Sequence, residues 1–269
     1  MTAEPTGLKL ERPGVTLAYE RVGAGPAVLL LHATLASTRE MRPLAKRLAS
    51  RFRVFSIDRR GSGQSRMHET VHGAVDVADH VDDLVELIAS EGLGPVAVVG
   101  HSYGGCLALE LAARQPELVE WAWVYEPPYA QVGPEDVRTR LLDVGRVTAE
   151  AAASGGPRAA AMAFFAGVSG PGAAASLSPT ARERIMREGG GAIADASLQG
   201  FEPEGLGRIG CPVAVATGSN SDAFYVQIAD ALVDRIATAQ RVCLDGVDHL
   251  APIMEARTIA RAVEGFVRT

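Results

Sequence analysis

Hydrophobic and polar positions along this chain follow two alternating patterns. Short continuous apolar runs predict strands that are buried on both faces of a sheet, and they lie at residues 27–31, 54–57, 96–99, 119–125, 213–217 and 241–244. Between them, apolar residues at helical spacing predict helices over residues 37–48, 77–88, 103–114, 222–236 and 255–267. Near the amino terminus, residues 8–10 and 15–19 flank a Pro-Gly pair and predict a hairpin. This alternation indicates an α/β fold with a mostly parallel sheet and helices on both faces.

The alternation is interrupted in the middle of the chain, where helical patterns follow one another with no convincing strand. These patterns predict helices over residues 137–152, 157–168 and 179–189. Because the strand series resumes at residue 213, we expect a helical cap, or lid, inserted between two late strands. The predicted organisation is a core domain of residues 1–128 and 210–269 with a cap of residues 129–209.

Composition narrows the class of protein. The 269 residues are 47% hydrophobic, which argues against disorder, and a net charge of −6 argues against a nucleic-acid-binding surface. No stretch approaches 18 uninterrupted apolar residues, and the first residues lack the pattern of a signal peptide. Three cysteines without paired spacing predict reduced thiols rather than a zinc site. We therefore expect a cytoplasmic monomer or homodimer that uses no cofactor, no metal and no membrane and that binds a small molecule.

A candidate nucleophile follows one of the buried strands. Residues 100–105 have the sequence G-H-S-Y-G-G, a G-x-S-x-G pattern between a strand and a helix, as a nucleophile elbow requires. The residues that flank the serine in such a sharp turn must be small, and Gly100, Gly104 and Gly105 meet that need. In an open parallel sheet, ligands bind at the carboxyl ends of the strands. We therefore predict that Ser102 is the nucleophile.

A serine hydroxyl is a weak nucleophile unless a base removes its proton, so we examined the six histidines. His249 follows the last predicted strand, in a loop before the final helix, and is the predicted base. His32 ends an earlier strand, and we expect its ring nitrogens to tie that loop together. The others lie within the elbow or in or beside a polar helical region, and they are His101, His68, His72 and His80.

Two carboxylates are candidates for the acid that orients the histidine. Glu126 ends the strand over residues 119–125, is held extended by Pro127, and has the length to reach a histidine from the neighbouring strand. Asp222 follows the strand over residues 213–217, but it also fits as the N-cap of the next helix. We favour Glu126 and keep Asp222 as the alternative.

Attack by Ser102 would place negative charge on a substrate oxygen, and hydrogen-bond donors must stabilise that charge. This stabilisation is usually the largest contribution to catalysis. We expect the backbone N–H groups of Thr34 and Tyr103 to converge there as an oxyanion hole. A further run at residues 58–65, D-R-R-G-S-G-Q-S, is interpreted as scaffold, a tight glycine turn with an internal Asp–Arg network. A phosphate-binding role is disfavoured because no G-K-[ST] or G-x-G-x-x-G pattern follows.

Together these motifs resemble the α/β-hydrolase fold superfamily. Residues 32–33 are similar to its H-G oxyanion loop with alanine for glycine, and residues 58–65, 100–104 and 246–249 match its D-x-R-G-x-G-x-S, elbow and G-x-x-H motifs. The chain departs from the usual pattern at Ser221, where an aspartate is expected. Zearalenone-type lactonases and one group of haloalkane dehalogenases look similar in carrying a glutamate after the earlier strand. Dehalogenation and epoxide hydrolysis are disfavoured, because both use aspartate at the position of Ser102.

The resemblance implies a serine hydrolase that cleaves a carboxylic ester or lactone through an acyl-enzyme. In this hypothesis Ser102, His249 and Glu126 form the triad and Thr34 and Tyr103 hold the oxyanion. Two alternatives remain open, a hydrolase-fold small-molecule receptor with vestigial activity and a cofactor-free carbon–carbon bond hydrolase or lyase. The cap is expected to line the substrate pocket, with candidate lining residues Tyr129, Met162, Phe164 and Phe165.

Overall fold

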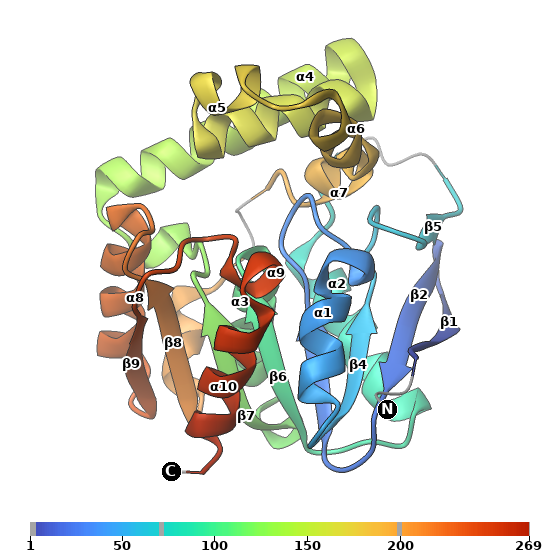
Figure 1. Cartoon of the computed structure of the whole chain (residues 1–269), viewed down its shortest axis with the longest axis vertical. Coiled ribbons are helices and arrows are strands. Elements are labelled where there is room, and N and C mark those ends of the chain that lie inside the picture. Colours follow the sequence, from blue (N-terminus) through green and yellow to red (C-terminus); the bar gives the residue numbers. More distant parts are fainter. Residues whose placement is uncertain (1–3, 70–72, 198–200, 269) are drawn as a thin grey trace.

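A nine-stranded, mostly parallel sheet forms the centre of the computed structural model, which describes residues 4–69, 73–197 and 201–268 (Figure 1). The strands are β1 (Thr6–Arg12), β2 (Val15–Val22), β3 (Ala27–Leu31), β4 (Arg53–Ile57), β5 (Arg66–Met67), β6 (Val96–His101), β7 (Val119–Tyr125), β8 (Val213–Gly218) and β9 (Ala239–Leu244). Their order in the sheet is β1-β2-β4-β3-β6-β7-β8-β9, and β5 pairs with β2. All pairings from β4 through β9 are parallel, whereas β2 is antiparallel to β1, β4 and β5.

Helices cover both faces of this sheet, as the continuous apolar runs predict. Side chains of β3 alternate between the two faces, so that Leu29 and Leu31 join one core cluster and Val28 and Leu30 join the other. The first cluster is closed by α2 (Val77–Ser90), α3 (Tyr103–Arg114) and α8 (Ala223–Arg235). The second is closed by α1 (Thr38–Leu48), α9 (Ala251–Met254) and α10 (Ala256–Phe266). A strand series buried on both faces therefore gives the α/β architecture.

The segment between β7 and β8 is helical and lies over one end of the sheet (Figure 1). Its helices, here called the cap helices, are α4 (Glu135–Ser169), α5 (Pro171–Ala175), α6 (Pro179–Arg187) and α7 (Gly189–Ala194). The two helices predicted over residues 137–152 and 157–168 are the two halves of α4, which kinks at Gly156 with a φ of 71°. Short 3-10 turns flank the cap helices at Ala130–Val132 and Pro203–Arg208, and a third, Pro116–Leu118, precedes β7.

The residues that the structure describes contain neither a membrane-spanning helix nor a cluster of metal ligands. None of their helices combines the length and the apolar character that crossing a bilayer requires. The same residues contain no group of three or more His, Cys, Asp or Glu side chains arranged to hold a metal ion.

Candidate active site

The predicted elbow is a sharp turn between β6 and α3 with Ser102 at its tip. Ser102 has a φ of 53° and a ψ of −122°, a backbone conformation that costs a non-glycine residue about 1–3 kcal/mol. A Cβ at Gly100 would lie 2.4 Å from the carbonyl oxygen of Gly104, and a Cβ at Gly104 would lie 2.6 Å from that of His32. Only glycine fits at these two positions, so the sequence pattern has a direct steric cause.

His249 and Glu126 form the central polar contact of the site. The Nδ1 atom of His249 lies 2.7 Å from Oε2 of Glu126, whose side chain is fully buried. The other carboxylate oxygen, Oε1, accepts a hydrogen bond of 2.8 Å from the backbone N–H of Gly218. Because a carboxylate only accepts hydrogen bonds, the proton of the imidazole lies on Nδ1, and Nε2 remains as the basic nitrogen. The His249 side chain is 23% exposed and lines the same cavity as Ser102.

The sequence predicted that Glu126 would reach a histidine from the strand next to its own, β7. His249 instead comes from a strand farther along the sheet. It follows β9, which lies two positions along the sheet from β7, with β8 in between. The loop that carries His249 therefore passes over the end of β8. A Cβ at Gly218, the last residue of β8, would lie 2.1 Å from the carbonyl oxygen of Val247, so the absence of a side chain there makes the passage possible.

Three aromatic residues that the sequence analysis missed hold the His249 loop in place. The Tyr225 ring stacks on the His249 ring at 4.4 Å and 9°. His101 Nε2 donates to the carbonyl oxygen of His249 at 2.8 Å, and the Tyr125 hydroxyl donates to that of Asp248 at 2.7 Å. Burial, together with the nearby His249, lowers the pKa of His101 well below its usual value, so His101 is a neutral donor. The only sequence signal was that His101 and Tyr125 directly precede Ser102 and Glu126.

Asp222, the alternative acid, has other partners. Its side chain accepts a hydrogen bond from the backbone N–H of Phe224 at 3.2 Å and so caps α8. It also forms an exposed ion pair of 3.1 Å with Arg140 of α4. The structure therefore brings Glu126, and not Asp222, to Nδ1 of His249.

The loop after β3 carries Thr34 beside the elbow. Thr34, Ser102 and Tyr103 all line one cavity, and in the described part of the chain neither the Thr34 nor the Tyr103 N–H donates to a backbone carbonyl. His32 ties the loop together as expected, since Nδ1 donates to the Ala33 carbonyl at 2.8 Å and Nε2 accepts from the backbone N–H of Arg59 at 3.2 Å. Burial lowers the pKa of His32 well below its usual value, which keeps one nitrogen free to accept.

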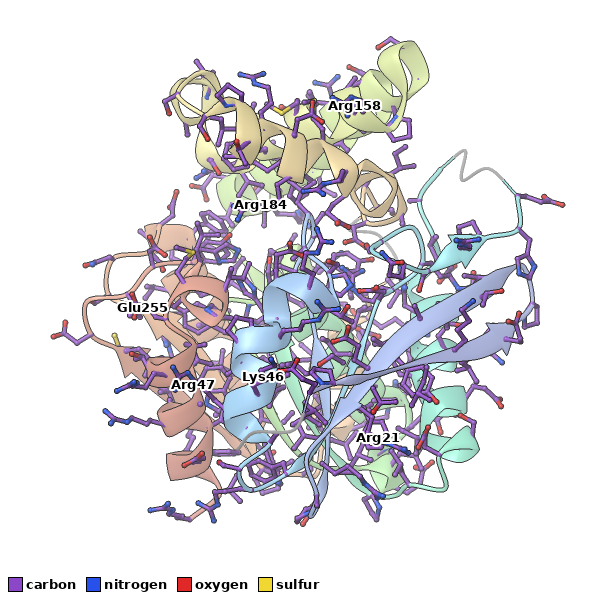
Figure 2. All side chains as sticks on the ribbon, turned by 45° about the vertical axis from the view of Figure 1, so that its right-hand side comes forward. Arg21, Lys46, Arg47, Arg158, Arg184 and Glu255 are labelled. Atoms are coloured by element: carbon purple, nitrogen blue, oxygen red, sulfur yellow. The ribbon has the colours of Figure 1, made fainter. Side chains whose placement is uncertain are left out.

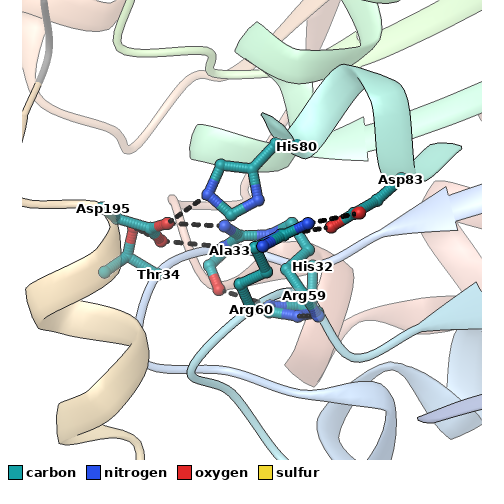
Figure 3. A network of polar contacts seen from close by, with 8 residues as sticks. All are labelled: His32, Ala33, Thr34, Arg59, Arg60, His80, Asp83 and Asp195. Atoms are coloured by element: carbon teal, nitrogen blue, oxygen red, sulfur yellow. Dashed lines mark hydrogen bonds and ion pairs between the residues drawn. The ribbon is translucent and has the colours of Figure 1, made fainter. Parts of the chain in front are cut away.

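The internal Asp–Arg network predicted for residues 58–65 is wrong. Asp58 instead accepts hydrogen bonds from the backbone N–H groups of Thr38 and Gln64, at 2.6 and 2.8 Å. Each arginine pairs outside the run, Arg59 with Asp195 and Arg60 with Asp83 (Figure 3). Charges adjacent in sequence were assumed to pair with one another, but consecutive residues after a strand point to different sides of the chain.

Two further histidines, His80 and His68, lie outside the site. His80, which the sequence placed in a polar helical region, is buried in α2 with 2% exposure. His68 is exposed and contacts the hydroxyl of Thr16 at 3.1 Å. His72 lies outside the described residues.

A cavity of about 240 Å³ lies between the core and the cap helices α4 and α6, and Ser102 and His249 are part of its wall. Its cap side is mostly apolar and includes Leu141, Val144, Phe164, Phe165 and Ile185. Arg184 of α6 also lines it, and Figure 2 shows this residue on the side of the cap that faces the core.

Two of the four predicted lining residues are not part of this wall. Phe164 and Phe165 line the cavity, whereas Met162 and Tyr129 do not. Tyr129 is fully buried, and its hydroxyl donates to Glu110 of α3. Tyr129 therefore packs in the core, although the preceding residue, Pro128, lines the cavity.

Comparison with known proteins identifies the fold family of the chain. A family model described as the alpha/beta hydrolase fold matches residues 26–163. A 2-(acetamidomethylene)succinate hydrolase of Mesorhizobium japonicum is 35% identical over 105 residues, which cover 39% of this chain and 37% of that protein. An uncharacterized hydrolase of Bacillus subtilis, YraK, is 32% identical over 123 residues, which cover 46% of this chain and 45% of that protein. The chain thus spans less than half the length of these relatives.

Solved structures match over almost the whole chain. A thermophilic esterase from Thermogutta terrifontis has a TM-score of 0.76 at 22% identity, covering 99% of this chain and 98% of the esterase. The enol-lactonase from Burkholderia xenovorans has a TM-score of 0.75 at 21% identity, covering 97% of this chain and all of the lactonase. At these identities the likeness shows the shared fold.

Proposed function

This chain belongs to the α/β-hydrolase family, and on that premise we propose that it is a serine hydrolase cleaving a small carboxylic ester or lactone. The observation that carries the proposal is the contact between His249 Nδ1 and the buried Glu126, at a cavity that Ser102 also lines. Nucleophile, base and orienting acid are the three groups that covalent acyl transfer requires.

Each residue has a defined step in the proposed reaction. His249 Nε2 takes the proton of the Ser102 hydroxyl as Oγ attacks the carbonyl carbon, and Glu126 stabilises the imidazolium through Nδ1–H. The N–H groups of Thr34 and Tyr103 donate to the oxyanion. His249 then gives its proton to the leaving oxygen, which departs as an alcohol or, for a lactone, stays attached to the acyl group.

Water completes the cycle by the same route. His249 Nε2 takes a proton from the water as its oxygen attacks the acyl carbon, and the oxyanion forms again at the same donors. Collapse releases the acid and returns the proton to Ser102 Oγ. His249 mediates every proton transfer in the scheme, and the two backbone N–H groups stabilise the oxyanion by hydrogen bonds.

Support for the substrate class comes from the cavity and from the relatives. Phe164, Phe165 and the neighbouring aliphatic side chains favour an acyl or alcohol group with an apolar portion. Esterases and an enol-lactonase share the fold, and a relative named as a hydrolase shares part of the sequence.

Covalent labelling tests the nucleophile. We expect a fluorophosphonate probe to modify the wild-type protein and to leave Ser102→Ala unmodified.

Kinetics on a generic ester test the acid. Glu126→Gln should lose about 10⁴-fold in kcat, because the histidine loses its orienting carboxylate. An unlabelled wild-type protein would contradict the proposal, and ligand-induced thermal stabilisation without turnover would favour the receptor hypothesis.

A further inference from the structure

Asp195, which follows α7, is a carboxylate of the cap segment that lies buried beside the candidate active site. Both of its oxygens accept hydrogen bonds from the Arg59 guanidinium, at 2.6 and 2.8 Å. Its Oδ2 also accepts from the Thr34 hydroxyl at 2.8 Å (Figure 3). The side chain of Asp195 has no exposed surface, and that of Arg59 is 2% exposed. Such charge-assisted, bidentate contacts fix geometry more strictly than neutral hydrogen bonds.

Arg59 extends this contact to the second proposed oxyanion donor. Its guanidinium lies 4.9 Å from the centre of the Tyr103 ring. Its backbone N–H donates to Nε2 of His32, the residue that holds the Ala33 carbonyl. Arg59 and Asp195 together therefore touch the side chains of both Thr34 and Tyr103.

The loop that carries Thr34 needs such support, because Leu35 adopts a φ of 60°. A non-glycine residue in this region persists only where its surroundings determine the conformation from several sides. His32 holds the loop from the core, through Ala33. Asp195 holds it from the cap, through the Thr34 hydroxyl.

α7 is seated closely on the core, which makes the cap a firm support. A Cβ at Gly61 would lie 2.6 Å from the carbonyl oxygen of Gly190, and one at Gly190 would lie 2.5 Å from that of Gly61. The backbone N–H of Gly63 donates to the Glu188 carboxylate at 3.0 Å. The backbone of the core thus contacts the backbone at the start of α7, and Asp195, which forms the buried ion pair, directly follows the end of α7.

We propose that Asp195 is a positioning residue for the oxyanion hole, so that the hole is complete only while α7 is seated on the core. The inference rests on the proposed function, since it needs an oxyanion at Ser102. Asp195 itself does not touch the substrate oxygen; it acts by fixing Thr34 through its hydroxyl and through Arg59.

The decisive variant is Thr34→Val, which keeps the backbone N–H and the shape of the side chain but removes the hydroxyl. We expect kcat on a generic ester to fall about 10- to 100-fold with KM nearly unchanged, because a displaced donor weakens transition-state binding alone. Thr34→Ser retains the hydroxyl and should restore most of kcat. Asp195→Asn should lose at least as much as Thr34→Val.

Asp83→Asn is the matched control, since it disturbs the equivalent contact of Arg60 without touching Thr34. Its kcat should stay within about twofold of the wild type, as for distant, independent sites. The second measurement is the affinity for a trifluoromethyl ketone, whose adduct with Ser102 places an oxyanion in the hole. That affinity should fall in parallel with kcat/KM across the Thr34 and Asp195 variants.

The outcomes separate the two claims. An active wild type with a folded Thr34→Val variant of unchanged kcat and ketone affinity overturns the inference alone. The same holds if Thr34→Ser loses as much as Thr34→Val. A wild type that neither reacts with the fluorophosphonate nor turns over any ester overturns the proposed function, and the inference with it.

Discussion

Arg59 and Arg60 are consecutive residues that form two nearly identical ion pairs in different regions of the molecule. Arg59 binds Asp195 at 2.6 and 2.8 Å, and Arg60 binds Asp83 at 2.7 and 2.9 Å. Asp83 belongs to α2 of the core and also binds Arg12, near the surface. Asp195 belongs to the cap segment and also binds Thr34, at the candidate active site.

Charge and geometry alone do not decide the role of a buried ion pair. Both pairs join elements far apart in sequence, and both satisfy a guanidinium bidentately. They differ in the third residue that the carboxylate contacts, which is Arg12 in one case and Thr34 in the other. Asp83 therefore links elements of the core, whereas Asp195 links the cap segment to the core and, in our proposal, supports catalysis.

The largest expected effect is on the free energy of unfolding. Asp195→Ala leaves the Arg59 guanidinium buried without a partner and should cost about 3–5 kcal/mol. Asp83→Ala should cost less, because the Arg60 side chain is 10% exposed and water can reach part of it. Urea unfolding of both variants measures the difference. Equal losses, or a larger loss for Asp83→Ala, would contradict the assigned difference in burial.

Replacing both members of a pair should separate stability from activity. Arg59→Met combined with Asp195→Leu removes both charges and should recover most of the lost stability, because no unpaired charge remains. Its kcat should stay about 10- to 100-fold below the wild type, since the Thr34 hydroxyl has lost its acceptor. Arg60→Met with Asp83→Leu should recover stability and retain kcat. Equal activity of the two double variants would remove the functional distinction between the pairs.

Acid should lower the free energy of unfolding through His80, whose Nε2 lies 3.9 Å from the carboxylate of Asp195, the partner of Arg59. Burial, with the nearby arginines, lowers the pKa of His80 well below its usual value. The unfolded chain therefore binds a proton below about pH 6.5 that the folded chain does not, so stability falls as pH drops below 6.5. His80→Gln should flatten this decline by up to about 1.4 kcal/mol per pH unit. The exposed His68→Gln is the control, and equal slopes in the two variants would argue against a role for His80.

The smallest effect is expected at a third Arg–Asp pair, Arg140–Asp222, which also joins the cap to the core. Both side chains are nearly half exposed, and exposed pairs contribute about 0–1 kcal/mol. Asp222→Asn keeps a good N-cap for α8, so stability and ester turnover should both stay close to wild type. Thermal unfolding and kcat on the same ester check this. A loss of kcat comparable to that of Glu126→Gln would reassign the acid.

The framework of the protein was predictable because it depends on local patterns. Continuous apolar runs predicted β3, β6, β7 and β8, since a strand between two helical layers needs no polar side. The position of Ser102 followed from glycines that the turn requires for steric reasons. Glu126 could be selected over Asp222 from its place at a strand end, and the structure brings it to His249. The extended conformation expected before Pro127 is wrong, because Glu126 has a φ of 49°.

The contacts that stabilise the site were not predictable in the same way. Asp195 lies 161 residues after Thr34, in a segment without a motif, and only the seating of α7 brings the two together. Tyr225 lies in the first turn of α8, where nothing in the sequence indicates a ring stacked on His249. The sequence placed His80 in or beside a polar helical region, yet its side chain is buried. Its burial follows from packing between α2 and α3, as its ring meets that of Tyr103.

The contact between Gly61 and Gly190 distinguishes the part of the cap that can be varied in protein engineering from the part that must be kept. A library that changes substrate preference can vary the α4 side chains that line the cavity, such as Phe164 and Phe165. Gly190 tolerates no side chain, since any Cβ would collide with the backbone of Gly61. Exchanging cap segments between related enzymes should therefore succeed when the exchanged segment ends before α7 and fail when it replaces α7.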